Sequence, residues 1–200
     1  MKRGVAPISF VTGTQTELLY AYYGASTNLA TFTAEDNLMK TYPSCVLPGS
    51  LFSKVGPQSS SFELVCAGQV GSTATPTFTF TVRLISGASV AWSAGGIVLG
   101  TSNAVTAGST VTLAPYRLRV HIGVRSIAAA GSATTGVVTM GNIDGPGFPT
   151  EGSIPANNVS PLVSTIDVGA TYSLFVSAAC SASNALNLVN LQCVKLYGEN

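Results

Sequence analysis

The chain has 200 residues, of which 46% are apolar and only 8% are charged, and its formal net charge is +1. The length allows one large domain with a sizeable core, and the near-neutral charge excludes a non-specific nucleic-acid binder, which needs excess lysine and arginine to displace phosphate counterions. Solubility must instead rest on Ser, Thr and Gly, and weak charge repulsion between copies favours a protein that packs against other protein.

The N-terminal residues show no convincing export signal. Lys2 and Arg3 imitate the basic start of a signal peptide, but Pro7, Ser9 and Thr12 interrupt the apolar segment that should follow. No apolar run reaches the length of about 18 residues that a membrane-spanning helix needs, so we expect no membrane association. We expect residues 1–35 to form an arm or extension and residues 36–200 to form one domain.

Two segments show the alternation of a half-buried strand most clearly. Residues 75–84 alternate apolar side chains with Thr and Arg, and residues 115–127 alternate aliphatic side chains with Arg117, Arg119 and His121. Further strands are expected at 5–12, 17–23, 61–70, 88–99, 105–113, 136–140, 171–178 and 185–197. Short strands joined by Gly-Ser turns, without crossover helices, predict an all-β antiparallel β-sandwich of about 8–10 strands, with a jelly roll as the leading topology.

Residues 141–161 contain four prolines and four glycines. Proline cannot donate a hydrogen bond to a strand neighbour, so we expect a long loop here that lacks strand pairing. Loops of this length in a compact domain are usually functional or disordered, and we expect this one to contact neighbouring proteins.

Four cysteines are spread along the chain: Cys45, Cys66, Cys180 and Cys193. They form no CxxC pair, and the single histidine, His121, cannot complete a zinc site with such scattered partners. Cys66, Cys180 and Cys193 lie in apolar alternating segments, and without an export signal we expect them to be buried, reduced thiols, although the spacing alone leaves three disulfide connectivities open. We expect no metal and no cofactor.

The chain offers little catalytic chemistry. No GxSxG elbow, Walker A motif or dinucleotide fingerprint is present. His121 lies mid-strand beside arginines, and their charge disfavours the imidazolium that a general base must form. We therefore expect that the protein is not an enzyme.

Three of the five arginines, Arg117, Arg119 and Arg125, lie within nine residues of one predicted strand. Residues two apart on a strand project from the same face, and guanidinium groups in such a row suit bidentate pairing with carboxylates of another protein. The alternative is an ordinary solvated strand face. With Lys2 and Arg3, these residues are our candidates for docking a partner.

Several segments resemble a recurring pattern of tailed-bacteriophage virion proteins with a small β-sandwich. They are the Gly- and Thr-rich hairpin at residues 67–84, the strand at 118–127 with its Ile-Gly-Val-Arg-Ser-Ile end, residues 165–167, and the turn at 180–186 with Ala-Ser-Asn. The resemblance runs from about residue 47 to the C-terminus, while residues 1–45 and the Pro- and Gly-rich loop at 141–161 have no counterpart in it.

This resemblance implies a non-enzymatic virion component: a capsid decoration (cement) protein, a head fibre or a tail appendage. Such proteins are often homotrimers, and the implied partner is the major capsid protein or another virion protein. The implied location is the capsid surface, after synthesis in the host cytoplasm. Of these possibilities we expect a decoration protein that stabilises the head shell.

Two other functions remain open from the sequence. A single-jelly-roll coat protein would share the fold, but it usually carries a strongly basic arm, and here only Lys2 and Arg3 are available. A carbohydrate-binding or adhesin appendage would need exposed aromatic side chains. The chain offers Trp92, Tyr20, Tyr22, Tyr23 and Tyr42 for that role, although aromatic residues more often fill cores and interfaces.

Overall fold

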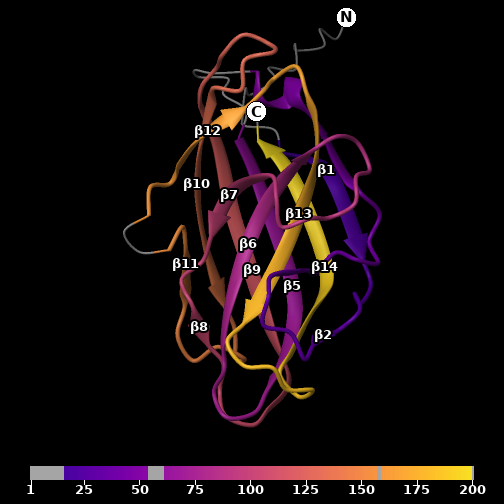
Figure 1. The fold of residues 1–200 in the computed structure, drawn as a ribbon, viewed down its shortest axis with the longest axis vertical. Coiled ribbons are helices and arrows are strands. Elements are labelled where there is room, and N and C mark those ends of the chain that lie inside the picture. The colour runs from indigo at the N-terminus through magenta and orange to yellow at the C-terminus, as the bar shows by residue number, and fades with distance from the viewer. Residues whose placement is uncertain (1–15, 54–60, 157–158, 200) are drawn as a thin grey trace, which may run out of the picture.

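The computed structural model describes residues 16–53, 61–156 and 159–199. Two antiparallel β-sheets pack face to face, and their strands run along the long axis of the molecule (Figure 1). The prediction of an all-β antiparallel sandwich is confirmed. In the described part of the chain the only helix is the short 3₁₀ helix η1 (Gly49–Phe52).

The strands divide between a sheet of eight and a sheet of six. Sheet A contains β1 (Thr16–Tyr23), β2 (Leu29–Ala30), β5 (Ser61–Ser72), β9 (Val111–Ser126), β10 (Thr135–Asp144), β11 (Gly152–Ile154), β12 (Leu162–Ile166) and β14 (Leu188–Glu199). Sheet B contains β3 (Asp36–Asn37), β4 (Cys45–Pro48), β6 (Thr77–Ser86), β7 (Ile97–Thr101), β8 (Val105–Thr106) and β13 (Thr171–Cys180).

The strand order is that of a jelly roll. The main strands pair as a nested series, β1 with β14, β3 and β4 with β13, β5 with β9, and β6 with β7, and successive pairs fall in alternate sheets. Such nesting arises when one long antiparallel ribbon wraps around an axis, so that the same face of the ribbon is turned inward in both sheets. Strands β10, β11 and β12 extend sheet A beyond β9.

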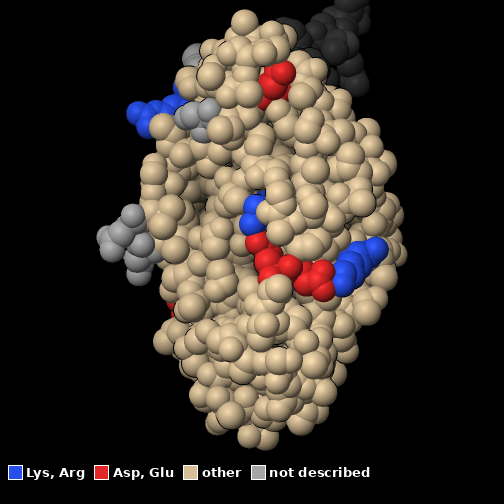
Figure 2. All heavy atoms as spheres, viewed as in Figure 1, with Lys and Arg blue, Asp and Glu red and all other residues tan. Residues whose placement is uncertain are grey.

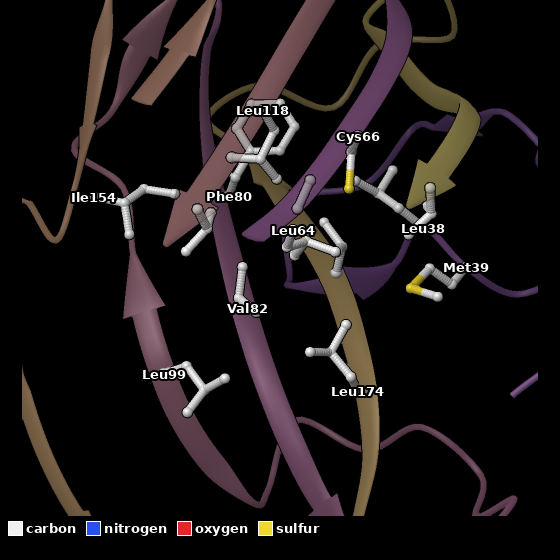
Figure 3. Packing of buried hydrophobic residues seen from close by; sticks show 14 of the residues in the cluster. Leu38, Met39, Leu64, Cys66, Phe80, Val82, Leu99, Leu118, Ile154 and Leu174 are labelled. Atoms are coloured by element: carbon white, nitrogen blue, oxygen red, sulfur yellow. The ribbon is translucent and has the colours of Figure 1, made fainter. Parts of the chain in front are cut away.

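The core lies between the sheets and follows directly from the alternation in the sequence. On β5 the buried side chains are every second residue, including Leu64 and Cys66, and on β9 they include Leu118. Opposite them, Phe80 and Leu174 enter from sheet B (Figure 3). All five are inaccessible to solvent, so the two sheets are held together mainly by the burial of apolar surface.

An aromatic cluster fills one part of this core. Phe148, from the turn after β10, packs against Phe78, Phe80 and Tyr116 at centroid distances of 6.1, 5.9 and 5.7 Å. The Tyr116 hydroxyl donates a hydrogen bond of 3.0 Å to the Asn190 carbonyl oxygen, which satisfies its buried polar end. The cluster ties the turn after β10 to both sheets.

The N-terminal boundary differs from the expectation for residues 16–35. The sequence predicts an arm outside the sandwich, but β1 pairs with β14 from Thr16 to Tyr23, and Leu29–Ala30 pairs with the same strand. The reason is that residues 17–23 have the alternating side chains of a strand, so β1 can pair with the edge of β14. Residues 1–15, including Lys2, Arg3 and the strand expected at 5–12, lie outside the described residues.

The segment 141–161 is also more regular than expected. Strand β10 continues to Asp144, and β11 pairs back onto Gly141–Ile143. Glycine is required at 141, where a Cβ atom would lie 2.9 Å from the Val120 Cα on the neighbouring strand. The four prolines stand outside these paired residues, so they do not interrupt the hydrogen bonding. The expectation of an unpaired loop is therefore wrong for the residues of β10 and β11.

Two other strand boundaries shift. Residues 88–96 are not a strand, because β7 begins only at Ile97, and they instead form part of a connection from β6. The sequence predicts strands at 105–113 and 115–127, whereas the structure has the short β8 and a single continuous β9 that begins at Val111. Pro115 is accommodated within β9 opposite Gln69, at a point where the sequence suggests a break.

Candidate functional sites

The predicted arginines lie on the outward side of sheet A. Alternation along β9 buries Leu118, Val120 and Ile122 and turns Arg117 and Arg119 outward, and it exposes Arg125 near the end of the strand. We call the outer surface of sheet A the open face. The outward orientation of this arginine row is as the sequence predicts. Lys2 and Arg3 lie outside the described residues, so their relation to the row stays a prediction.

Two of these arginines already pair with carboxylates of their own chain. Arg119 donates from Nε and Nη2 to Glu63 Oε1, at 3.0 and 2.5 Å, and Arg117 Nη2 donates to Asp144 Oδ2 at 3.1 Å. His121 Nε2 lies 3.6 Å from the same Glu63 oxygen. Strand register explains the pairs, because Glu63 stands opposite His121 and Asp144 opposite Arg117.

Arg125 and Lys195 have no ion pair within residues 16–53, 61–156 and 159–199. Lys195 Nζ instead lies 5.2 Å from the centroid of the Tyr23 ring, a cation–π contact. These two cations can therefore pair with carboxylates of a partner without breaking an ion pair among the described residues, although Lys195 would have to leave its contact with Tyr23.

Exposed apolar side chains lie on both sides of the charged residues of the open face. Leu18, Tyr23 and Met140 are 53%, 65% and 60% exposed. Leu18 begins a cross-strand row that passes through Tyr197, Glu63 and His121 to Met140, in register across five strands. The open face is thus a broad sheet surface on which exposed apolar side chains flank ionic ones.

The outer surface of sheet B, which we call the covered face, differs because chain segments cross it. The Ser173 hydroxyl donates to the Gly87 carbonyl oxygen at 2.9 Å, in the connection between β6 and β7, and this connection passes in front of β13 in Figure 1. Nearby, Glu35 accepts hydrogen bonds from Arg83 Nε and Nη2 at 2.6 and 2.5 Å and from the Ser177 hydroxyl at 2.5 Å.

Several charged side chains lie together in one short row on this side of the molecule. Figure 2 shows a short row of basic and acidic side chains near the middle of a mostly uncharged surface. It contains the Arg83–Glu35 pair and the Lys40–Asp36 pair, whose Nζ–Oδ2 distance is 2.6 Å. Burial alone would raise the pKa of Glu35, but the hydrogen bonds from Arg83 and Ser177 and the charge of Arg83 together lower it.

A hollow of about 170 Å³ lies beside this charged row. Its walls come from residues 37–45, from residues 90–92 of the connection and from Leu174 and Phe175 of β13. Trp92 and Tyr42, two of the aromatic residues considered for carbohydrate binding, both line it. The Trp92 Nε1 atom is buried and has no hydrogen-bond partner among the described residues.

The other aromatic candidates have different surroundings. The Tyr20 hydroxyl donates to the Pro43 carbonyl oxygen at 2.8 Å, and the Tyr22 ring packs on Tyr42 with 4.4 Å between centroids. Tyr23 is exposed on the open face. The five aromatic residues therefore do not form one site.

The four cysteines are free, as expected, and Cys45, Cys66 and Cys180 are buried. The expectation that Cys193 is also buried is wrong, because Cys193 lies on the outer side of β14, opposite Tyr23 and Ala67, and is partly exposed. Burial raises the pKa of the Cys45 thiol to about 12 and raises that of Cys66 still further. Such thiols stay protonated at neutral pH and are poor nucleophiles.

Among the described residues, no group of three His, Cys, Asp or Glu side chains is arranged to hold a metal ion. Within the same residues, no helix is long and apolar enough to cross a membrane.

Neither protein-family models nor curated proteins match this chain. A solved structure of the CBM2 module of the evolved Dit of Lactobacillus casei BL23 phage J-1 is similar to it in coarse outline. The alignment covers 94% of this chain and 97% of that chain, with 9% identity and a TM-score of 0.31. At that TM-score the likeness carries no functional assignment.

Sequence reasoning found the arginine row but missed the carboxylates that accompany it. Glu63 could have been found from the alternation of residues 61–70, which turns it outward. Asp144 could not, because the proline and glycine content of 141–161 hid the end of β10. The hollow was missed because the sequence predicts a strand at residues 88–99, whereas Trp92 lies in a crossing connection.

Proposed function

We propose that this chain is a non-enzymatic structural protein of a phage virion, and specifically a capsid decoration protein that docks on the head shell through its open face. The observation that carries the proposal is the open face itself, a broad sheet surface with exposed Leu18, Tyr23 and Met140 among ordered ionic side chains. Jelly rolls are common in viral capsid proteins, and this fold-level analogy, with the resemblance at residues 67–84 and 118–127, supports the virion assignment.

The chemistry of the open face suits a protein partner. Apolar side chains would supply the burial that drives association, while Arg125 and Lys195 would pair with carboxylates on the shell and orient the contact. Arg117 and Arg119 would keep their internal partners and present the remaining guanidinium hydrogens. Binding to the assembled shell, and not to its separated subunits, would stabilise the shell by mass action.

The test compares two substitutions at equally exposed apolar positions. Met140→Asp places a carboxylate on the open face, where Met140 is 60% exposed, whereas Leu186→Asp makes the same change at 61% exposure in the connection between β13 and β14. Each purified variant is mixed with head particles that lack the protein, and co-sedimentation is measured. We expect Met140→Asp to lose binding and Leu186→Asp to keep it, with equal melting temperatures. Equal binding by both variants would contradict docking through the open face.

Particle composition tests the virion assignment independently. In purified particles we expect copy numbers comparable to those of the major shell subunit, measured by gel densitometry. A handful of copies would point to an appendage, and absence from particles would overturn the assignment. We also propose that the protein is a homotrimer, as the family resemblance implies. Light scattering coupled to size-exclusion chromatography tests this, and a monomer would contradict it.

A further inference from the structure

We propose that the hollow beside Trp92 binds a single pyranose ring of a saccharide. The site lies on the sheet B side of the sandwich, opposite the open face, so it goes beyond the docking function proposed above and does not depend on it. Both surfaces could be occupied in the same molecule.

The hollow is a built feature of the fold. The connection that carries Trp92 is anchored where the Gly87 amide donates to the Thr171 carbonyl oxygen at 2.7 Å and where Ser173 donates to the Gly87 carbonyl oxygen. The opposite wall is anchored by Tyr42, whose hydroxyl donates to the Gly24 carbonyl oxygen at 2.6 Å. These bonds tie each wall to a strand or to a neighbouring segment, so the hollow is preorganised for a ligand.

One donor at this place lacks an acceptor. Trp92 Nε1 is buried and unpaired among the described residues. Asn37, which also lines the hollow, is held in place because its Oδ1 accepts a hydrogen bond of 2.8 Å from the Met39 amide. An unpaired buried donor costs free energy, and a ligand oxygen acceptor that reached Trp92 Nε1 from the hollow would recover it.

The remaining walls define the ligand class. Trp92, backed by the largely buried Tyr42 and Phe175, supplies aromatic surface that can pack against the CH groups of a sugar ring, and its unpaired Nε1 donor calls for an oxygen acceptor. Lys40 is already neutralised by Asp36, so the site favours an uncharged ligand over an anion. The volume of about 170 Å³ is below the roughly 300–1,000 Å³ of pockets for drug-sized molecules, which suits one ring and not a longer chain.

Trp92 is the single tryptophan of the chain, so its fluorescence reports directly on the hollow. The full chain is titrated with the methyl glycosides of glucose, galactose, N-acetylglucosamine and rhamnose, with glycerol as a control for small polyols. We expect at least one glycoside to shift the emission in a saturable way and glycerol to have no such effect. No saturable shift with any glycoside, or an equal shift with glycerol, would overturn the proposal.

Calorimetry on variants then locates the binding. Trp92→Ala should weaken the affinity for the responding glycoside by at least about tenfold, since an aromatic contact is lost. Tyr23→Ala, an aromatic change on the open face, should leave it unchanged. Unaltered binding by Trp92→Ala, or an equal loss in both variants, would overturn the site. Because the wild-type titration needs no variant, poor folding of Trp92→Ala would leave the fluorescence result decisive. A negative result for the hollow would not affect docking, which co-sedimentation measures separately.

Discussion

The two outer faces of the sandwich are built from the same alternating pattern but have opposite exposure. On β9, in sheet A, buried residues alternate with partly or fully exposed ones from Pro115 to Arg125. On β13, in sheet B, almost every residue is buried. Ser173 and Ser177 are outward-facing residues of β13 and are nevertheless 0% exposed, because residues 35 and 87 lie over them. Outward orientation on a strand therefore predicts solvent exposure only where no other segment crosses the sheet.

The difference also separates two kinds of surface. The open face keeps its charged and apolar side chains accessible over several strands, as a protein contact requires. The crossing segments on the covered face leave only a hollow, whose size suits a small ligand. Small hydroxyl residues on β13 allow this close crossing and satisfy the backbone groups that lie over them.

The largest effect is expected from truncation of Phe175 on the covered face. Phe175 is 7% exposed, so Phe175→Ala should lower the free energy of unfolding by about 3 kcal/mol through lost burial and the cavity left behind. Met140→Ala on the open face should change it by less than about 0.5 kcal/mol. Urea unfolding of both variants measures the difference, and similar losses would mean that the two faces are covered to the same extent.

Removal of an ion-pair partner should likewise lower the free energy of unfolding more on the covered face than on the open face. Glu35→Ala leaves the Arg83 guanidinium, whose side chain is 12% exposed, without its carboxylate, and should cost about 2 kcal/mol. Asp144→Ala removes the partner of Arg117, which is 51% exposed, and should cost less than about 1 kcal/mol. Denaturant unfolding at low salt checks this, and a larger loss for Asp144→Ala would reverse the comparison.

A smaller effect is the pH dependence that belongs to the Glu35 carboxylate. The pKa of Glu35 is lowered from 4.5 in the folded protein, so its stabilising contribution is complete above pH 4.5 and is lost as the pH falls through the folded value. The difference in unfolding free energy between wild type and Glu35→Gln should therefore be constant near neutral pH and shrink in acid. A difference that grows in acid would contradict the assigned direction.

The smallest change is expected for Cys193→Ser. Cys193 is partly exposed on the open face, so this exchange should alter the unfolding free energy by less than about 0.5 kcal/mol. Cys66, on the neighbouring strand but on the inner side, is 0% exposed, and Cys66→Ser should cost about 1–3 kcal/mol by burying a hydroxyl. Thermal unfolding distinguishes the two, and equal losses would show that Cys193 is not at an open surface.

Alternation alone predicted much of this molecule. It indicated the all-β class, assigned Leu118 and Arg119 to opposite sides of one strand, and placed Cys66 and Cys180 in the interior, because side chains on a strand must alternate whatever its neighbours are. The same rule could have shown that Glu63 faces outward.

Only the tertiary structure decided what lies beside each strand and what lies over it. The sequence of β9 does not specify that Glu63 stands opposite His121, because many registers satisfy the same alternation. Nor does it specify that the connection with Trp92 crosses β13, since a crossing segment has no periodicity of its own. Strand pairing and segment crossing depend on contacts between residues far apart in the chain, and these contacts made one outer face open and the other covered.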